Sequence, residues 1–328
     1  MLMRPRYVGV SAACLLALMA GAACGQTLPK GTGHAYPAKP IRMLSSAPGG
    51  SSDVVARMIT PALSANLGQQ IIVDNRGGFI SVEILTKAPP DGYTLLYFGS
   101  SLWLAPFLRS NVPYDPVRDF SPVALAVSAP TILVVHAAVA ANSVKDLIAL
   151  AKTKPGAFNY SSGPSGSVTH LAAELLKSMA GINMVRIPYK GQGPALNALL
   201  GAEVQLTFPS AGSVMTHVKA GKIRALAITS AEPSSLFPGL PTLAAAGVPG
   251  YESVQMSGIF SAPRTPKAIV DQLNREIVRV LNSADVKDRF SSSGLEAVGG
   301  SPEQFADKIK SEMTRMGKVI KDAGIKEE

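Results

Sequence analysis

Hydrophobic positions along this chain follow two alternating periods from Ile41 onward. Short β-branched runs, typical of buried strands, alternate with stretches in which apolar residues recur every three or four positions, typical of amphipathic helices. The expected strands are Ile41–Leu44, Gln70–Val73, Thr94–Phe98, Ile132–Val135, Met184–Pro188, Val204–Phe208 and Arg224–Thr229. The expected helices are Asp53–Leu67, Val144–Lys152, Val168–Met179, Ala195–Leu200 and Ser213–Ala220. This alternation predicts an α/β fold with parallel sheets.

The last hundred residues depart from this alternation. Ser230 to Gly250 is rich in Pro and Gly and reads as a long surface connection, and Ser253–Ala262 is strand-like. Two amphipathic helices follow without a strand between them, and we expect them to pack back onto an existing sheet. Their apolar stripes are Ile269, Leu273, Ile277, Val280 and Leu281 in the first, and Phe305, Ile309, Met313, Met316 and Ile320 in the second.

The order of these elements predicts two lobes. Extended crossings near Ile132–Val135 and Val254–Phe260 would divide the chain between them. We expect a discontinuous lobe 1 made of residues 36–134 and 262–328, and a continuous lobe 2 made of residues 135–261.

The first 23 residues have the pattern of a signal peptide. Arg4 and Arg6 form a basic start, Val8–Ala23 is small and apolar without charge, and Ala20-Gly21-Ala22 offers an A-x-A cleavage site. Residues 24–35 read as a flexible leader. No later apolar run reaches the roughly 18 residues that a membrane span needs, so we expect an exported protein.

Cysteine usage agrees with a chain that folds by packing alone. Cys14 lies in the signal peptide and leaves with it, and Cys24 cannot form an internal disulfide by itself. Cys24 has two interpretations: it is incidental to the cleavage site, or it carries a lipid anchor, which would make the protein a lipoprotein.

The charge of the chain argues against a nucleic-acid partner. The net charge is +9 from 31 basic and 22 acidic residues, and +7 remains (29 − 22) when Arg4 and Arg6 are removed. The basic residues are scattered singly or in pairs, as in Lys152 and Lys154, without interleaved aromatic residues. A solvated basic surface with a mild attraction for anions follows.

Motifs for metal, cofactor or covalent chemistry are missing from the sequence. His34, His136, His170 and His217 stand alone without metal-ligand spacing, and no Walker A pattern occurs. Gly163–Ser167 approaches G-x-S-x-G but ends in Ser. We therefore expect no cofactor and no metal, with His170 structural or ligand-positioning. A hydrolase using Ser165 or Ser167 with His170 stays as the enzymatic alternative.

Four loops rich in Gly, Ser and Thr carry the positive signal. They are Pro48–Asp53, Gly99–Leu102, Ser161–His170 and Lys190–Pro194, and each is expected to open a helix. Free backbone N–H groups and the positive helix ends there favour a carboxylate or phosphate, in the crevice beyond the strand ends. Small residues also simply permit tight turns, and Asp53 is as well explained as a cap of its own helix as by a ligand contact.

The chain resembles the periplasmic solute receptors of the tripartite tricarboxylate transporter family, often called Bug proteins. The matching blocks cover nearly the whole mature chain in order: YPAKPIRMLSSAPGGSSD, APPDGYTLLYFGSS, VPYDPVRDFSPVALA, NYSSGPSGSVTHLAAELLKSMAGINMVRIPYKGQGPAL, HVKAGKIRALAITS, LPTLAAAGVPGYE and GSPEQF.

The resemblance implies a two-lobed type II periplasmic-binding-protein fold with a ligand cleft between the lobes that closes on a small organic acid. It places ligand-binding residues in the loops of both lobes. Those of the first lobe are Pro48, Gly49, Gly50, Ser51, Ser52, Asp53, Ser100 and Ser101. Those of the second are Gly163, Ser165, Ser167, Val168, Thr169, His170, Tyr189, Lys190 and Pro209.

Two departures from the family pattern bear on the ligand. The loop after Asn75-Arg76 is shorter and bulkier than usual, and Phe208-Pro209 stands where the family has Phe-Asp. Because Pro209 offers no side-chain acceptor, we expect a plain carboxylate or aromatic acid rather than an amino acid. Phe79 and Trp103 would be apolar walls of the site or core residues.

The function that this resemblance implies is a non-enzymatic one. A periplasmic, monomeric binding protein would capture a small carboxylate by hinge closure and deliver it to the membrane permease of a tripartite tricarboxylate-type transporter. A sensory adaptor that docks a signalling receptor fits the same sequence.

Overall fold

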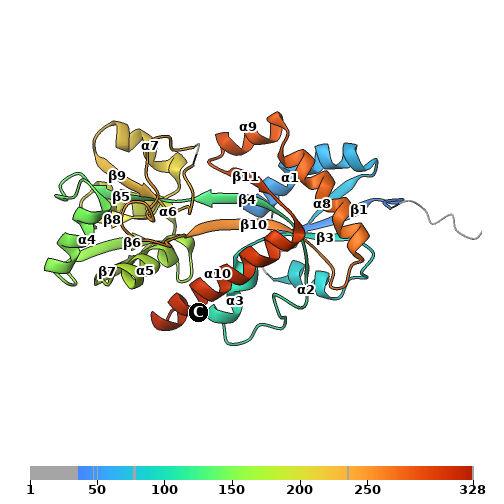
Figure 1. Ribbon diagram of the computed structural model, residues 1–328, viewed down its shortest axis with the longest axis horizontal. Helices are drawn as coiled ribbons and strands as arrows, with labels where there is room; N and C mark the ends of the chain where they lie inside the picture. The colour runs from blue at the N-terminus through green and yellow to red at the C-terminus, as the bar shows by residue number, and fades with distance from the viewer. Residues whose placement is uncertain (1–35, 47, 50, 77–78, 235, 327–328) are drawn as a thin grey trace, which may run out of the picture.

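Two sheets organise the computed structural model, which describes residues 36–326 except 47, 50, 77–78 and 235. The predicted signal peptide, the leader and Cys24 therefore lie outside the described residues. The first sheet has the order β11-β4-β10-β3-β1-β2 and the second β7-β6-β8-β5-β9 (Figure 1). The first sheet consists of β1 (Ile41–Ser45), β2 (Ile71–Asn75), β3 (Thr94–Gly99), β4 (Ser121–Pro130), β10 (Val254–Ser261) and β11 (Glu296–Gly299). The second consists of β5 (Ile132–His136), β6 (Phe158–Ser162), β7 (Met184–Pro188), β8 (Leu206–Thr207) and β9 (Ile223–Ile228).

Helices cover both faces of each sheet, because alternate side chains of the strands point to opposite faces. In β1, Met43 packs in one apolar cluster and Leu44 in another. The helices of the first lobe are α1 (Ser51–Leu67), α2 (Ile80–Thr86), α3 (Ser101–Leu108), α8 (Lys267–Leu281), α9 (Ala284–Ser292) and α10 (Pro302–Asp322). Residues of α1, α8 and α9 cover the Met43 face, and residues of α2, α3 and α10 cover the Leu44 face.

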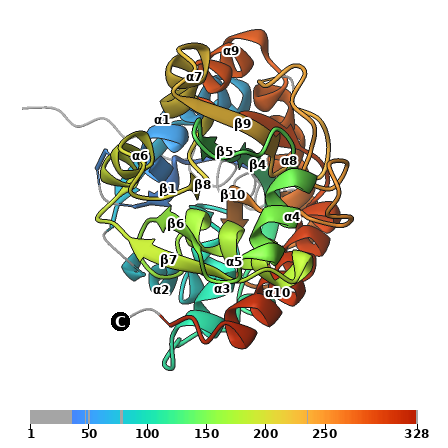
Figure 2. The same ribbon diagram turned by 90° about the vertical axis from the view of Figure 1, so that its left-hand side faces the viewer.

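The second sheet repeats this alternation. Ile132 and Val134 of β5 pack in one cluster, and Leu133 and Val135 pack in the other. The helices are α4 (Val144–Thr153), α5 (Val168–Ala180), α6 (Gln192–Leu200) and α7 (Ala211–Lys219). Figure 2 shows α6 and α7 beside one face and α4 and α5 beside the other. The expected two-lobed α/β fold is thus confirmed.

The pairing of the strands corrects the expectation of parallel sheets. β1 pairs in parallel with β2 and β3, but β10 runs antiparallel to β3 and β4, and β5 runs antiparallel to β8 and β9. The reason is that the chain leaves the first sheet along β4 and returns along β10, so these two strands must run in opposite directions. Both sheets are therefore mixed.

Both crossings lie near the expected positions, but the strands around them pair differently from the expected division into lobes. The chain passes from β4 to β5 at Thr131, so residues 132–134, which the sequence placed in lobe 1, pair within the second sheet. The return crossing lies at β10, where it was expected, but β10 pairs within the first sheet. The prediction of two C-terminal helices without a strand was wrong, because α9 and the short β11 lie between α8 and α10.

The last helix links the two lobes. α10 contacts β4 and α3 of the first lobe and α5 of the second, and Figure 1 shows it running along one side of the molecule past both (red). Its apolar stripe, with Phe305, Ile309 and Met316, belongs to a cluster that continues into the second lobe. None of the described helices combines the length and apolar character that a membrane crossing needs.

Candidate ligand-binding cleft

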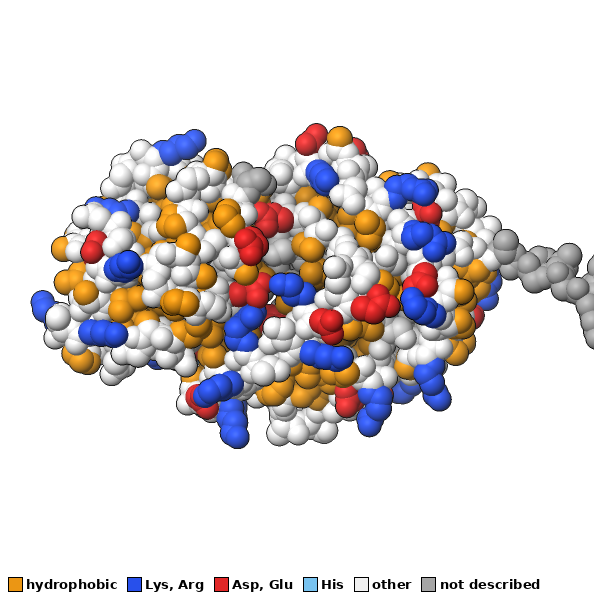
Figure 3. Space-filling view, in the orientation of Figure 1, with side chains coloured by type: hydrophobic (Ala, Val, Ile, Leu, Met, Phe, Trp, Pro, Cys, Tyr) orange, Lys and Arg blue, Asp and Glu red, His pale blue; other side chains and the backbone are white. Residues whose placement is uncertain are grey.

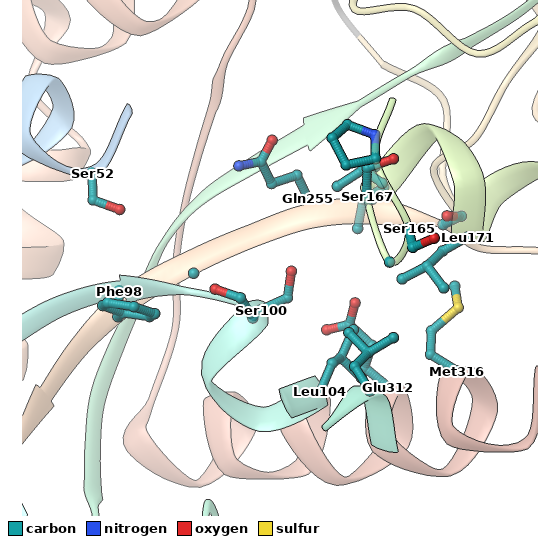
Figure 4. A pocket seen from close by; sticks show the side chains of 18 of the residues that line it. Ser52, Phe98, Ser100, Leu104, Ser165, Ser167, Leu171, Gln255, Glu312 and Met316 are labelled. Carbon is teal, nitrogen blue, oxygen red and sulfur yellow. The ribbon is translucent and has the colours of Figure 1, made fainter. Parts of the chain in front are cut away.

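A cavity of about 470 Å³ lies between the lobes. Figure 4 shows its walls, which come from the loops of both sheets, the crossing strand β10 and α10. The lining residues are Ser46, Ser52, Phe98, Gly99, Ser100, Ser101, Leu104 and Leu108 of the first lobe, Pro164, Ser165, Gly166, Ser167, Val168 and Leu171 of the second, Ser253, Val254 and Gln255 at the crossing, and Glu312 and Met316 of α10. Its size suits a small organic molecule.

Three helices begin at this cavity. Ser52 lies in the first turn of α1, Ser101 is the first residue of α3, and Val168 is the first residue of α5; all three line the space. The first N–H groups of a helix lack partners within it, and the helix dipole is positive there. The predicted loops after β1, β3 and β6 are therefore brought together, with Ser52, Ser100, Ser101, Ser165, Ser167 and Val168 at the cavity.

Asp53 organises the first-lobe loop. Its Oδ2 accepts a hydrogen bond from the backbone N–H of Gly49 (2.9 Å), and its Oδ1 accepts from Arg57 Nε (2.8 Å) and Asn75 Nδ2 (2.8 Å). Burial alone would raise the pKa of Asp53, but the bonds from Asn75 and Gly49 and the charge of Arg57 lower it. With both oxygens engaged, Asp53 shapes the loop as an acid in the first turn of α1; it is not the N-cap of that helix, which begins at Ser51.

Thr169 and Ser167 organise the second-lobe loop. Thr169 Oγ1 accepts from the N–H of Gly163 (2.9 Å) and lies 3.2 Å from Ser167 Oγ, which in turn accepts from the N–H of His170 and caps α5. His170 Nδ1 accepts from the N–H of Gly166 (3.2 Å). Burial, with the charge of Arg186, lowers the pKa of His170 to about 4, so it is neutral at pH 7.

Arg186 of β7 holds this loop, and the sequence patterns did not indicate it. Its Nε donates to Ser162 Oγ (2.8 Å), and its two terminal nitrogens donate to Gly163 O (2.8 Å) and Ser165 Oγ (3.2 Å). A guanidinium with three hydrogen bonds to one loop holds it in place and adds positive charge beside the cavity. The only signal in the sequence was a charged residue inside the strand pattern of residues 184–188.

The remaining predicted residues do not line the cavity. Tyr189 donates to Glu203 (3.3 Å), Lys190 is exposed, and the carbonyl of the buried Pro209 accepts from the N–H of Ile132 (3.0 Å). The others away from the lining are Pro48, Gly49, Asp53, Gly163, Thr169 and His170. Gly50 lies outside the described residues, and Ser51 begins α1. Of the two candidate apolar walls, Trp103 is fully buried core and Phe79 packs against Phe98 and Tyr114.

Glu312 is the second residue that the sequence analysis missed. It is 4% exposed, lines the cavity from α10, and accepts a hydrogen bond from Trp103 Nε1 (2.7 Å) at Oε2. Burial raises the pKa of Glu312 to about 7. The signal was present in the sequence, because position 312 falls between Ile309 and Met316 on the apolar stripe of the last helix.

The cavity shows little that could perform catalysis. Ser167 Oγ meets the backbone N–H of His170 and not its ring, so the described residues form no serine–histidine pair of the kind a hydrolase needs. Within the described ranges, no group of three or more His, Cys, Asp or Glu residues could hold a metal ion. Basic and acidic side chains alternate over the face in Figure 3 without a uniform basic patch.

Comparison with known proteins decides the family. Residues 55–325 match the model of the tripartite tricarboxylate transporter family receptor. The chain belongs to this family. The protein BugT of Bordetella pertussis is 36% identical to it over 297 residues, which cover 89% of this chain and 91% of BugT. The predicted resemblance is thus confirmed, and the family is one of transport receptors and not of enzymes.

Two solved structures are similar to this receptor. R. palustris Rpa4515 with adipate is 34% identical, with a TM-score of 0.69 over 89% of this chain and 99% of that chain. A TctC solute-binding protein from Polaromonas without ligand is 25% identical, with a TM-score of 0.81 over 88% of this chain and 99% of that chain.

Proposed function

We propose that this receptor captures a small organic carboxylate between its two lobes and delivers it to the membrane permease of a tripartite tricarboxylate-type transporter. The observation that carries the proposal is the convergence of the N-termini of α1, α3 and α5 on one cavity. Their N–H groups, the hydroxyls of Ser52, Ser100 and Ser165, and the nearby charge of Arg186 suit an anion. The adipate bound to Rpa4515 supports this ligand class.

Capture would proceed by closure of the lobes about the β4–β5 and β10 crossings. The shape of this chain is more similar to that of the ligand-free Polaromonas protein (TM-score 0.81) than to that of adipate-bound Rpa4515 (0.69), despite the lower identity (25% against 34%), which supports a difference in lobe arrangement between ligand-free and ligand-bound receptors. We propose residues 36–131 and 254–326 as one lobe and 132–253 as the other, following the sheets. A ligand that contacts both lobes stabilises the closed form.

The site of action would be the periplasm. The basic start and apolar run of residues 1–23 support export, and Cys24 would either be incidental or carry a lipid anchor. The protein would act as a monomer, since one chain supplies all of the residues that line the cavity.

The test is calorimetric titration with a panel of mono-, di- and tricarboxylates. In the variant Thr169→Val the hydroxyl that holds Gly163 is lost, and in Ser52→Pro a backbone N–H in the first turn of α1 is lost. Ser52→Pro should weaken binding about tenfold, which corresponds to one hydrogen bond to a charged group of about 1.4 kcal/mol. Thr169→Val should weaken binding less, because Thr169 holds the loop beside the cavity without lining it. Neither variant should unfold.

The matched control is Thr86→Val, which removes a hydroxyl bonded to Glu83 O away from the cavity and should leave affinity unchanged. Unchanged affinity in both cleft variants would refute the proposed site. No binding by any acid of the panel would refute the function.

A further inference from the structure

One side chain of the cleft has a position unlike the others. Glu312 is 4% exposed, yet Figure 4 shows its carboxyl group directed into the space between Ser100 and Ser165. Oε2 accepts from Trp103 Nε1 (2.7 Å), and no other described residue forms a hydrogen bond with the carboxyl group. A buried polar group at a cavity without a second partner is costly unless a ligand or water supplies one.

The charged groups near Glu312 leave it unpaired. On α10, Lys308 and Arg315 bind Glu252, at 3.4 Å and 3.0 Å, and not Glu312. On α5, which packs against α10, Lys177 binds Glu174 at 2.7 Å and His170 is neutral. β4 and α3 contain no Asp, Glu, Lys, Arg or His, and the ion pair of α8 with α10, Lys267–Glu303, lies in the first turn of α10.

The ionisation state of Glu312 decides what it can do for an anion. As a carboxylate it would repel a bound acid at close range in a poorly solvated cleft. As a carboxylic acid it keeps the acceptor that Trp103 uses and gains an O–H donor for the cavity. Burial already raises the pKa of Glu312 to about 7, so the uncharged form is accessible near neutral pH.

We propose that Glu312 contacts the ligand as a carboxylic acid and donates a hydrogen bond to an oxygen of the bound acid, so that the receptor takes up a proton as it binds. The proton goes from solvent to the Glu312 carboxylate, and no other bond changes. This inference rests on the proposed function, since it requires an anionic ligand in the same cleft. It makes Glu312 a specificity-determining residue that couples affinity to pH.

Trp103 provides the measurement, because it is the sole tryptophan of the chain and binds Glu312 directly. Its fluorescence in the ligand-free protein should change with pH around 7, and the change should be absent in Glu312→Gln. The ligand probe is adipate, or another acid of the panel if that acid binds more tightly. Affinity should fall about 25-fold between pH 6.5 and 8.5, as full coupling of one proton to each bound ligand requires for a group with a pKa of about 7.

Calorimetry in buffers of different ionisation enthalpy should show proton uptake at pH 7.5 in the wild type and none in Glu312→Gln. Glu312→Gln keeps an amide N–H donor, so it should bind the ligand equally well at pH 6.5 and at pH 8.5. Glu252→Gln, which changes a neighbouring acid outside the cavity lining, should retain the proton uptake. If Glu312 had only a structural role, Glu312→Gln would alter the stability of the protein but leave unchanged the number of protons taken up with the ligand.

The two failures are distinguishable. Binding with the same affinity at pH 6.5 and 8.5 and without proton uptake would overturn this inference and leave the proposed function standing. Absence of binding by every acid at every pH would overturn the proposed function and this inference with it.

Discussion

Asp53 at the start of α1 and Glu312 in the middle of α10 are both 4% exposed, and both belong to the structure around one cleft. Their pKa values are shifted in opposite directions: that of Asp53 is lowered and that of Glu312 is raised to about 7. The contribution of burial alone would raise the pKa of both residues. The difference is in the donors, since Asp53 accepts three hydrogen bonds, one from a guanidinium, and Glu312 accepts one from an indole.

The comparison shows how one cleft can hold a fixed charge and a variable one. The negative charge of Asp53 is compensated by Arg57 and serves to fix the loop at Gly49. Glu312 forms no ion pair among the described residues, and burial outweighs the more distant charges of Arg315 and Lys308, so its pKa is raised. Burial alone does not tell whether an acid is a structural or a titrating group, because the number of donors around it decides.

The largest effect should follow from changing Glu312. A carboxyl whose pKa is raised by folding contributes stability that is fully present below its unfolded pKa of 4.5 and is lost as pH rises through about 7. The free energy of unfolding of the wild type, relative to that of Glu312→Gln, should fall by about 3 kcal/mol between pH 4.5 and 8.

Urea unfolding at a series of pH values measures this difference. The pKa of His170 is lowered to about 4, so its contribution to the stability of the protein is lost as pH falls from 6.5 through 4. This contribution is the same in the wild type and in Glu312→Gln, so it cancels in the difference. A pH-independent difference between wild type and variant would show that Glu312 is ionised throughout, and would remove the contrast with Asp53.

Asp53→Asn should have the next largest effect and the opposite pH dependence. Because folding lowers the pKa of Asp53, its contribution is present above its ordinary pKa of 3.8 and is lost as pH falls through the lowered value. The variant should be about 2 kcal/mol less stable than wild type at pH 7, since an amide brings its N–H₂ against groups that donate. In acid the two unfolding curves should converge; a gap that widened in acid would reverse the assigned sign.

Asn75→Ala tests whether the number of hydrogen-bond donors around Asp53 sets its pKa. Asn75→Ala deletes the amide that donates to Asp53 Oδ1 and to Ser46 O. The pKa of Asp53 should rise toward its ordinary value, at a cost of about 1 kcal/mol in stability. Carbon-detected NMR titration of the Asp53 carboxyl group reads this directly. Ser64→Ala, which removes a hydroxyl bonded to Thr60 O and Ile71 N, should leave the Asp53 titration in place.

The same two residues show which parts of the site could be predicted from the sequence. Asp53 is local, since its Gly49 and Arg57 partners lie four residues away, and the pattern already placed an acid in the first turn of this helix. Glu312 meets Trp103 across 209 positions, so only its place on an apolar stripe could mark it. Arg186 reaches its loop from the neighbouring strand β7, whose register with β6 no local pattern predicts.

The fold shows a similar limit. Strands with dense β-branched residues, such as Ile132–His136, were predicted close to their ends. β4 was missed because its sequence, SPVALAVSAP, is rich in small residues and bounded by prolines. The strand expected at Val204–Phe208 is shorter in the structure, where β8 comprises Leu206–Thr207. The direction of pairing depends on how the chain crosses between the lobes, which no local pattern encodes.

The smallest effect concerns the charges around Glu312. Glu252 contributes to raising the pKa of Glu312, whereas Arg315 lowers it. In Glu252→Gln the negative charge of residue 252 is removed and Arg315 loses its ion-pair partner. Both changes should lower the pKa of Glu312, and the corresponding change in free energy should be less than about 0.5 kcal/mol. The midpoint of the Trp103 fluorescence transition should therefore move to lower pH, while Glu303→Gln in the first turn of α10 should not move it. An upward shift in Glu252→Gln would mean that Glu252 acts on Glu312 by holding Arg315 near it, and that donors alone do not explain why the two buried acids differ.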